Sequence, residues 1–171
     1  MVIENRFLQK SLGVFLDKLL GVILIALMLF TTFLMFIQVV LRYVFHAPLM
    51  GIEELLNFPA FWLYVLGAAG ASLQRNHIKC EILSVYIKKA KTLAILNITR
   101  SILNCALLLW ILKWAYWLLA YSLRVNKTSA LLYIPMKYVE SALFVGIVLM
   151  LVFSLIELFE QFIHLKMSKA S

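Results

Sequence analysis

Residues 19–41 of the chain read LLGVILIALMLFTTFLMFIQVVL, with no charged side chain between Lys18 and Arg42. At a rise of about 1.5 Å per residue, a helix over this stretch is about 34 Å long, enough to cross a hydrocarbon core of about 30 Å. The apolar segment of a cleavable signal peptide is shorter, about 7–15 residues, and no small-x-small cleavage site follows this one. The stretch therefore predicts a membrane-spanning helix that is retained.

Three more apolar segments lie further along the chain. A second span is expected at residues 55–74, a third at 101–121 with a helical extension before it, and a fourth at 136–156, directly after Pro135. The pattern predicts an all-α, polytopic membrane protein with four transmembrane helices, forming a single membrane domain over residues 1–171.

Two segments outside these spans have the spacing of amphipathic helices. Within residues 1–18, apolar side chains recur every three to four positions and the charges fall on the opposite side. The connection between the second and third spans repeats this pattern beside several lysines: Lys79, Lys88, Lys89 and Lys91. Helices of this kind lie in the headgroup plane, so we expect an N-terminal and a cytoplasmic-loop surface helix.

Composition agrees with a chain solvated by a lipid bilayer. Hydrophobic residues make up 64% and charged residues 14% of the 171 residues, against about 45–50% and about 25% in soluble proteins. The net charge of +8 comes from basic clusters between the apolar runs, where cations meet anionic headgroups. No nucleic-acid partner is expected.

The basic residues also predict the orientation. Eleven lysines and arginines lie in the N-terminal segment, the connection after the second span and the C-terminal tail, whereas the two opposite connections hold four. The positive-inside rule therefore predicts a multi-pass protein of the bacterial inner membrane with both termini in the cytoplasm.

A charged cluster is expected at the outer ends of the first two spans. Glu53 and Glu54 open the second span, where carboxylates face the positive end of the helix dipole. A short connection brings them past Arg42. An ion pair with Arg42 and simple helix-dipole placement both remain open, and the cluster is a candidate for a structural lock or a docking surface.

Two helix faces are candidates for packing or subunit contact. The run from Gly67 to Ser72 contains the small residues that let helix backbones approach closely in lipid: Gly67, Ala68, Gly70 and Ala71. The third span carries an aromatic stripe of Trp110, Trp114, Trp117 and Tyr121. Lys113 lies on the same helix, where an intramembrane charge either snorkels to the headgroups or pairs with a partner subunit.

Catalytic and cofactor sites find little support. Cys80 and Cys105 form no C-x-x-C pair, and His46, His77 and His164 lie at span ends and not on facing helices as haem ligands would. We expect no enzyme activity and no cofactor in this chain.

The ordered motifs from the end of the first span onward resemble a known family. They are QVVLRYVF (38–45), Pro48, EEL (53–55), FWL (61–63), GAA (67–69) and RNHIKCEIL (75–83). The set resembles the DctQ-like small membrane subunit of tripartite ATP-independent periplasmic (TRAP) transporters, with Arg75 and His77 in a cytoplasmic loop motif. The family commonly has valine-aspartate where Cys80-Glu81 stand, a hydrophobic residue near Gly51 and a basic residue near Asn57.

The resemblance implies a scaffold role in sodium-coupled symport. A periplasmic binding protein captures a carboxylate-bearing solute, sialic acid or a C4-dicarboxylate, and a large membrane subunit that holds the sodium ions carries it across. The alternatives are a self-sufficient small homodimeric transporter, for which no intramembrane carboxylate is found in residues 19–41, and a four-helix cytochrome-type anchor.

Overall fold

The computed structural model describes residues 11–46, 50–74 and 90–170. These residues contain four long helices: α2 (Ser11–Tyr43), α3 (Met50–Leu73), α5 (Ala90–Val125) and α6 (Lys137–Ala170). Each is long and apolar enough to cross a bilayer. The predicted all-α fold with four membrane-spanning helices is confirmed.

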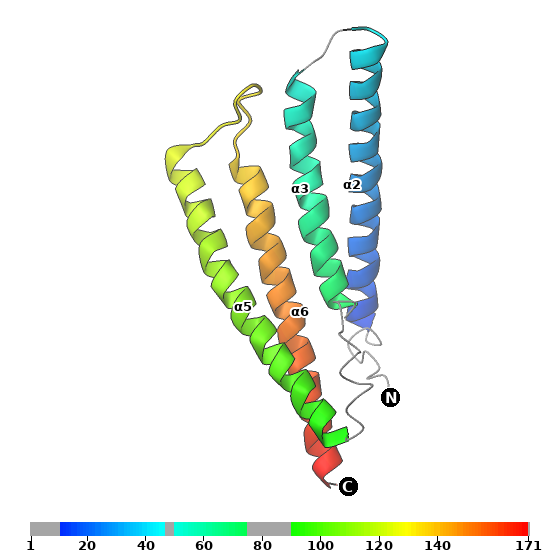
Figure 1. The fold of residues 1–171 in the computed structure, drawn as a ribbon, viewed down its shortest axis with the longest axis vertical. Helices are drawn as coiled ribbons and strands as arrows, with labels where there is room; N and C mark the ends of the chain where they lie inside the picture. Colours follow the sequence, from blue (N-terminus) through cyan, green and yellow to red (C-terminus); the bar gives the residue numbers. More distant parts are fainter. Residues whose placement is uncertain (1–10, 47–49, 75–89, 171) are drawn as a thin grey trace.

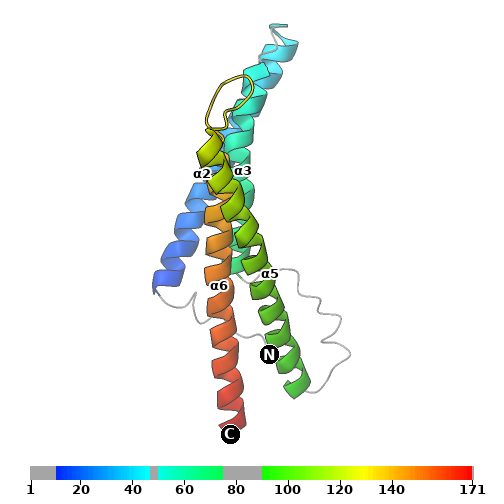
Figure 2. The ribbon, with the colours of Figure 1, turned by 90° about the vertical axis from the view of Figure 1, so that its left-hand side faces the viewer.

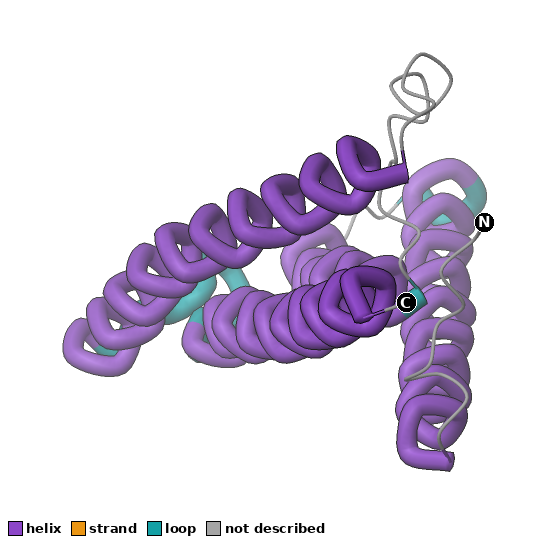
Figure 3. The backbone as a smooth tube through the Cα atoms, turned by 90° about the horizontal axis from the view of Figure 1, so that it is seen from below, coloured by secondary structure: helices purple, strands orange, loops and turns teal. Residues whose placement is uncertain are grey.

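The helices are arranged in the spatial order α2, α3, α6, α5 (Figure 1). α3 packs against α2 on one side and α6 on the other, and α5 packs against α6. Figure 2 shows that the lower ends of α2 and α5 diverge on opposite sides of α6. Seen from below, the same two helices lie at the margins (Figure 3). Because α2 and α5 lie at the two ends of this row, each keeps a long face that the described residues do not cover.

The two ends of the molecule can be named from these helices. We call the end where α2 begins and α6 ends the terminal end, and the end where α2 finishes and α6 begins the loop end (Figure 1). At the terminal end Gln74 Nε2 donates a hydrogen bond to Asp17 Oδ1 at 2.9 Å. At the loop end Gln38 Nε2 donates to Glu53 Oε1 at 2.8 Å. A glutamine–carboxylate bond therefore joins α2 to α3 at each end of their contact.

The main apolar core joins α2, α3 and α6. Its buried members are Leu20, Leu66, Ala69, Leu73 and Phe153. Leu16 packs against this cluster, which explains why residues 11–18 continue α2 without a break, although we expected them to lie in a separate surface helix. The rest of that expected helix and the expected loop helix fall at residues 1–10 and 75–89, outside the described part of the chain.

Candidate functional site

The loop between α5 and α6 is folded on itself at the loop end. The Ser129 N–H donates to Ile134 O and the Met136 N–H to Lys127 O, both at 2.9 Å. Asn126, directly after α5, has a φ of 47°, the left-handed conformation that commonly ends a helix. These bonds give the connection a hairpin shape, visible above α5 and α6 in Figure 1.

Glu54 holds the tip of this hairpin from the first turns of α3. Its Oε1 accepts hydrogen bonds from the Ala130 N–H at 2.8 Å and the Leu131 N–H at 3.2 Å. Its Oε2 accepts from the Leu131 N–H at 3.0 Å and the Leu132 N–H at 2.8 Å. Successive N–H groups in a turn form a concave anion-binding surface. One carboxylate thereby fixes the loop to a helix that is distant in sequence.

The same contact is supported by packing around Gly51. A Cβ placed on Gly51 would lie 3.1 Å from Leu132 Cδ2, so the loop side chain rests directly on the start of α3. A larger residue at position 51 would press on this side chain. The missing side chain at Gly51 therefore helps the loop approach the helix that carries Glu54.

The expected cluster of Arg42, Glu53 and Glu54 is divided between two contacts. Glu53 bonds to Gln38 and Glu54 bonds to the loop amides, while the Arg42 guanidinium lies 5.9 Å from the ring centroid of Tyr43. Within the described residues, no ion pair joins Arg42 to either glutamate. The geometry gives Glu54 a structural contact that the sequence did not indicate, because backbone N–H groups have no sequence signature.

A second contact fastens the loop to α6. Lys127 Nζ lies 3.8 Å from Glu140 Oε1, and Glu140 is only 6% exposed. Nearby, Trp62 Nε1 of α3 donates to the Tyr138 carbonyl at 3.2 Å. The start of α6 is thus tied both to the loop before it and to α3.

The small-residue run on α3 faces α2. Ala69 is fully buried, and a Cβ added at Gly67 or Gly70 would meet Leu24 of α2 at 3.9 or 3.8 Å. These are ordinary van der Waals distances, so the helices do not need glycine there. Ala68 and Ala71 are half-buried on the same helix.

One helix contact has no room for a Cβ and involves a glycine that the sequence prediction did not include. A Cβ added at Gly146 of α6 would lie 1.8 Å from Val65 Cγ1 and 3.4 Å from the Val65 carbonyl oxygen. Only glycine fits this contact between α3 and α6. Gly146 forms a small-x-x-x-small pair with Ala142, four residues before it, and Ala142 is buried as well. This pair is shorter than the run of small residues from Gly67 to Ser72, which drew the sequence prediction to α3.

The aromatic stripe of α5 points away from the rest of the chain. Trp110, Trp114, Trp117 and Tyr121 are 69%, 61%, 67% and 57% exposed. Lys113 is exposed as well. The opposite face of α5 packs on α6, where Ala115 is buried.

Polar side chains join α5 to α6 within the membrane-spanning segments. Asn104 Nδ2 donates to Ser154 Oγ at 2.9 Å, and the Cys105 thiol lies 3.3 Å from the same hydroxyl. Nearer the terminal end, Ser101 Oγ donates to Gln161 Oε1 at 3.0 Å. The sequence analysis missed these contacts, since single Ser and Asn residues are common in membrane helices and their partners are about fifty residues away.

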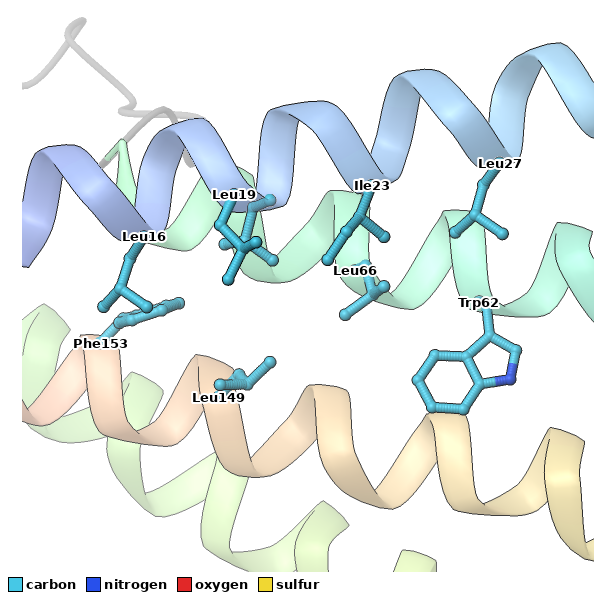
Figure 4. Close-up of a pocket in the computed structure, with 9 residues that line it drawn as sticks. Leu16, Leu19, Ile23, Leu27, Trp62, Leu66, Leu149 and Phe153 are labelled. Carbon is cyan, nitrogen blue, oxygen red and sulfur yellow. The ribbon is translucent and has the colours of Figure 1, made fainter.

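The groove between α2, α3 and α6 is apolar. It has a volume of about 420 Å³, and Figure 4 shows the leucines of α2 facing Trp62 and Leu66 of α3 and Leu149 and Phe153 of α6. Its lining carries no charged side chain that could bind an anionic solute. Across the described ranges, no group of three or more His, Cys, Asp or Glu side chains is placed to hold a metal ion. Arg75 and His77 lie outside those ranges.

Comparison with known proteins connects this architecture to transport. The family described as tripartite ATP-independent periplasmic transporters, DctQ component, matches residues 31–164. A protein of Haemophilus influenzae, provisionally named a TRAP transporter small permease protein, is 32% identical to this chain over 76 residues. That stretch is 44% of this chain and 47% of the relative, so the match spans about half of each.

Proposed function

This chain belongs to the DctQ component family of tripartite ATP-independent periplasmic transporters, and we propose that it acts there as a fixed membrane scaffold for a large transport subunit. The family and the four helices make it a multi-pass inner-membrane component of a transporter and not an enzyme. The scaffold role, the transported solute and the partner arrangement are the proposed part.

The observation that carries the scaffold role is the open row of helices. Within the apolar window of each helix, only 6% of the first span and 11% of the third are buried inside this chain. A transport site normally uses discontinuous helices that meet near mid-membrane, whereas α2, α3, α5 and α6 are each continuous. The described helices therefore have broad exposed faces that a partner could cover, and they lack the discontinuous helices of a transport site.

The proposed transport cycle places the chemistry in the partners. A periplasmic binding protein delivers a carboxylate-bearing solute of the sialic acid or C4-dicarboxylate class, and the large subunit couples its movement to sodium. With both termini in the cytoplasm, the loop end of this chain faces the periplasm. The hairpin held by Glu54 would then lie on the side from which the binding protein arrives.

Reconstitution tests the proposal directly. Proteoliposomes that contain this chain alone should accumulate no solute under a sodium gradient, whereas liposomes with the large subunit and binding protein added should. Omitting this chain from the complete set should abolish or strongly reduce uptake. Solute accumulation by this chain alone would overturn the scaffold role and favour a self-sufficient transporter.

A further inference from the structure

Lys113 is a charge in the middle of a membrane-spanning helix, on its uncovered side. It lies between Arg100 and Arg124 of α5, about 20 Å from the first and about 17 Å from the second along the helix axis. Both arginines are exposed, and they flank the third span predicted from the sequence at residues 101–121, so we expect them at the two headgroup layers. Lys113 is therefore close to the midplane of a bilayer that covers α5.

Snorkelling does not bring this ammonium to water. A fully extended lysine side chain reaches about 6 Å from its Cα, and half of a hydrocarbon core is about 15 Å. The ammonium of Lys113 would remain several ångströms below the headgroups. An ammonium that stays in hydrocarbon without a partner is strongly unfavourable, and such residues pair with another group.

No carboxylate in the described part of the chain lies at that depth. The chain has eight acidic residues. Asp17, Glu53, Glu54 and Glu140 lie within the first two turns of their helices. Glu157 bonds to Gln161, which pairs with Ser101 near the terminal end of α5, and Glu160 lies beyond Glu157 on α6. Glu4 and Glu81 lie outside the described residues. The described residues therefore give Lys113 no counter-charge, and we infer that another molecule supplies it.

The residues around Lys113 form a surface suited to a helix. Trp110, Trp114 and Trp117 are exposed beside it, and Tyr121 continues the stripe about 16 Å beyond Trp110 along the axis. An interfacial aromatic belt lies at headgroup level, so it accounts for Tyr121 but not for the deeper Trp110 and Trp114. We call the surface of Trp110, Lys113, Trp114 and Trp117 the α5 face.

We propose that the α5 face binds a transmembrane helix of the large subunit that carries an aspartate or glutamate at mid-membrane depth, opposite Lys113. This inference rests on the proposed scaffold role and adds to it the contact surface and the chemistry of the partner. A second copy of this chain does not fit, because it would bring a second lysine and no mid-membrane carboxylate. Lipid does not fit, because its anionic groups lie beyond the reach of the side chain.

Charge variants test the pairing in the assembled transporter. Lys113→Met should lower the amount of large subunit that co-purifies by about tenfold or more, since it leaves a carboxylate unpaired in a low-dielectric site. Lys113→Arg should keep most of the complex. Arg124→Met is the matched control on the same helix at headgroup level and should co-purify normally. Unchanged recovery with Lys113→Met would overturn the inference.

A reciprocal exchange identifies the partner group. Lys113→Glu should abolish co-purification, and changing one intramembrane aspartate or glutamate of the large subunit to lysine should restore it. If no such exchange restores the complex, the charge pair is not formed. Because Lys113 is exposed in this chain, the thermal stability of each variant purified alone should match the wild type, which separates lost association from misfolding.

Photo-crosslinking provides a test that leaves Lys113 intact. With benzoylphenylalanine in place of Trp114, the expected product joins this chain to a membrane-helix peptide of the large subunit that contains an acidic residue. Crosslinking to lipid alone or to a second copy of this chain would overturn the inference. If the wild-type chain neither co-purifies with the large subunit nor supports uptake, the proposed function fails, and this outcome is distinct from failure of the α5 face alone.

Discussion

Glu54 closes a contact between two segments that are 76 to 78 residues apart in the sequence. Its two oxygens accept from three successive N–H groups, so the energy of the contact depends on a full carboxylate and not on one hydrogen bond. Glu53, one residue earlier, accepts from a single glutamine. Glu53 and Glu54 can therefore be compared with each other to measure how much the carboxylate contact with the loop contributes to stability.

We expect Glu54→Gln to lower the Tm of the purified protein by a few degrees and Glu54→Ala to lower it further. The amide keeps one acceptor oxygen but loses the charge and half of the hydrogen bonds to the loop, because an NH₂ group cannot accept from an N–H. Glu53→Gln is the control and should have a smaller effect. Thermal unfolding in detergent measures all three. Equal effects at positions 53 and 54 would contradict the role assigned to the loop contact.

The sequence showed that Glu53 and Glu54 are unusual but not what they bind. Acidic residues at a helix start are expected from the helix dipole, and Arg42 was the nearest cation in the sequence. The actual partners are a glutamine and backbone amides of a distant loop, which only the three-dimensional arrangement brings close. Local patterns predict where a charge lies, but a contact across 76 residues depends on how the helices pack.

At the scale of helices, Gly146 lies where α6 meets α3 with no room for a Cβ. Gly146→Ala should destabilise the protein by about 1–3 kcal/mol, because the new methyl group overlaps Val65 and the β-branched valine has little rotamer freedom to move. Gly21→Ala is the matched control, since nothing lies within 4 Å of that Cβ. It should be neutral or slightly stabilising through helix propensity.

A compensating change makes the Gly146 experiment specific. Val65→Ala removes Cγ1, the one Val65 atom that the new Cβ would overlap, and leaves Val65 Cβ at 3.2 Å and the carbonyl oxygen at 3.4 Å. The double variant should therefore be more stable than the sum of the single effects predicts. Denaturation in mixed detergent micelles measures the four proteins. Strict additivity would mean that the two residues do not touch in solution.

The contact between α5 and α6 also depends on polar side chains. Ser154→Ala should lower stability by about 0.5–2 kcal/mol, because Asn104 would lose its partner inside the membrane-spanning part of the pair. Ser141→Ala is the control, since that hydroxyl bonds to the Tyr138 carbonyl of its own helix. If Ser154→Ala is as stable as the wild type, the hydrogen bond between Asn104 and Ser154 does not contribute to stability.

The helices themselves were readily predicted, and their partners were not. In lipid, the backbone N–H and C=O groups of a charge-free stretch of about twenty residues must bond within the segment, as in a helix. Residues 19–41 and 55–74 therefore predicted the fold class. Which faces meet is decided by shape. The sequence pointed to the run of small residues that contains Gly67 and Gly70, whereas Gly146, paired only with Ala142, leaves less room for a Cβ. The sequence also indicated the aromatic stripe of α5. It did not indicate that the described residues leave this stripe uncovered.

At the scale of the whole molecule, the distribution of charge predicts the orientation in the membrane. Reporter fusions after Lys169 and within residues 88–91 should report the cytoplasm, and a fusion at Lys127 should report the periplasm, because basic residues are retained on the cytoplasmic side. Alkaline phosphatase and fluorescent-protein activities measure the two sides. A cytoplasmic signal at Lys127 would contradict the predicted orientation.

In the proposed orientation, the loop end is the surface that faces a periplasmic partner. Tyr133 at the tip of the hairpin is 74% exposed and has a φ of 54°, a conformation that costs energy for a bulky aromatic residue. Tyr133→Asn removes the ring while asparagine tolerates the left-handed backbone. We therefore expect an unchanged or higher Tm for this variant, in contrast to the Glu54 variants.

If the binding protein docks on the hairpin, Tyr133→Asn should raise the binding-protein concentration needed for half-maximal uptake by about fivefold or more, since truncating an aromatic interface residue commonly costs over about 1 kcal/mol. Uptake into proteoliposomes over a range of binding-protein concentrations measures this. Asn126→Gly, which changes another left-handed position of the same loop without removing a ring, should leave the curve unchanged. An unchanged curve for Tyr133→Asn would restrict the hairpin to a structural role, because the same loop would then be held by Glu54 without contacting the partner.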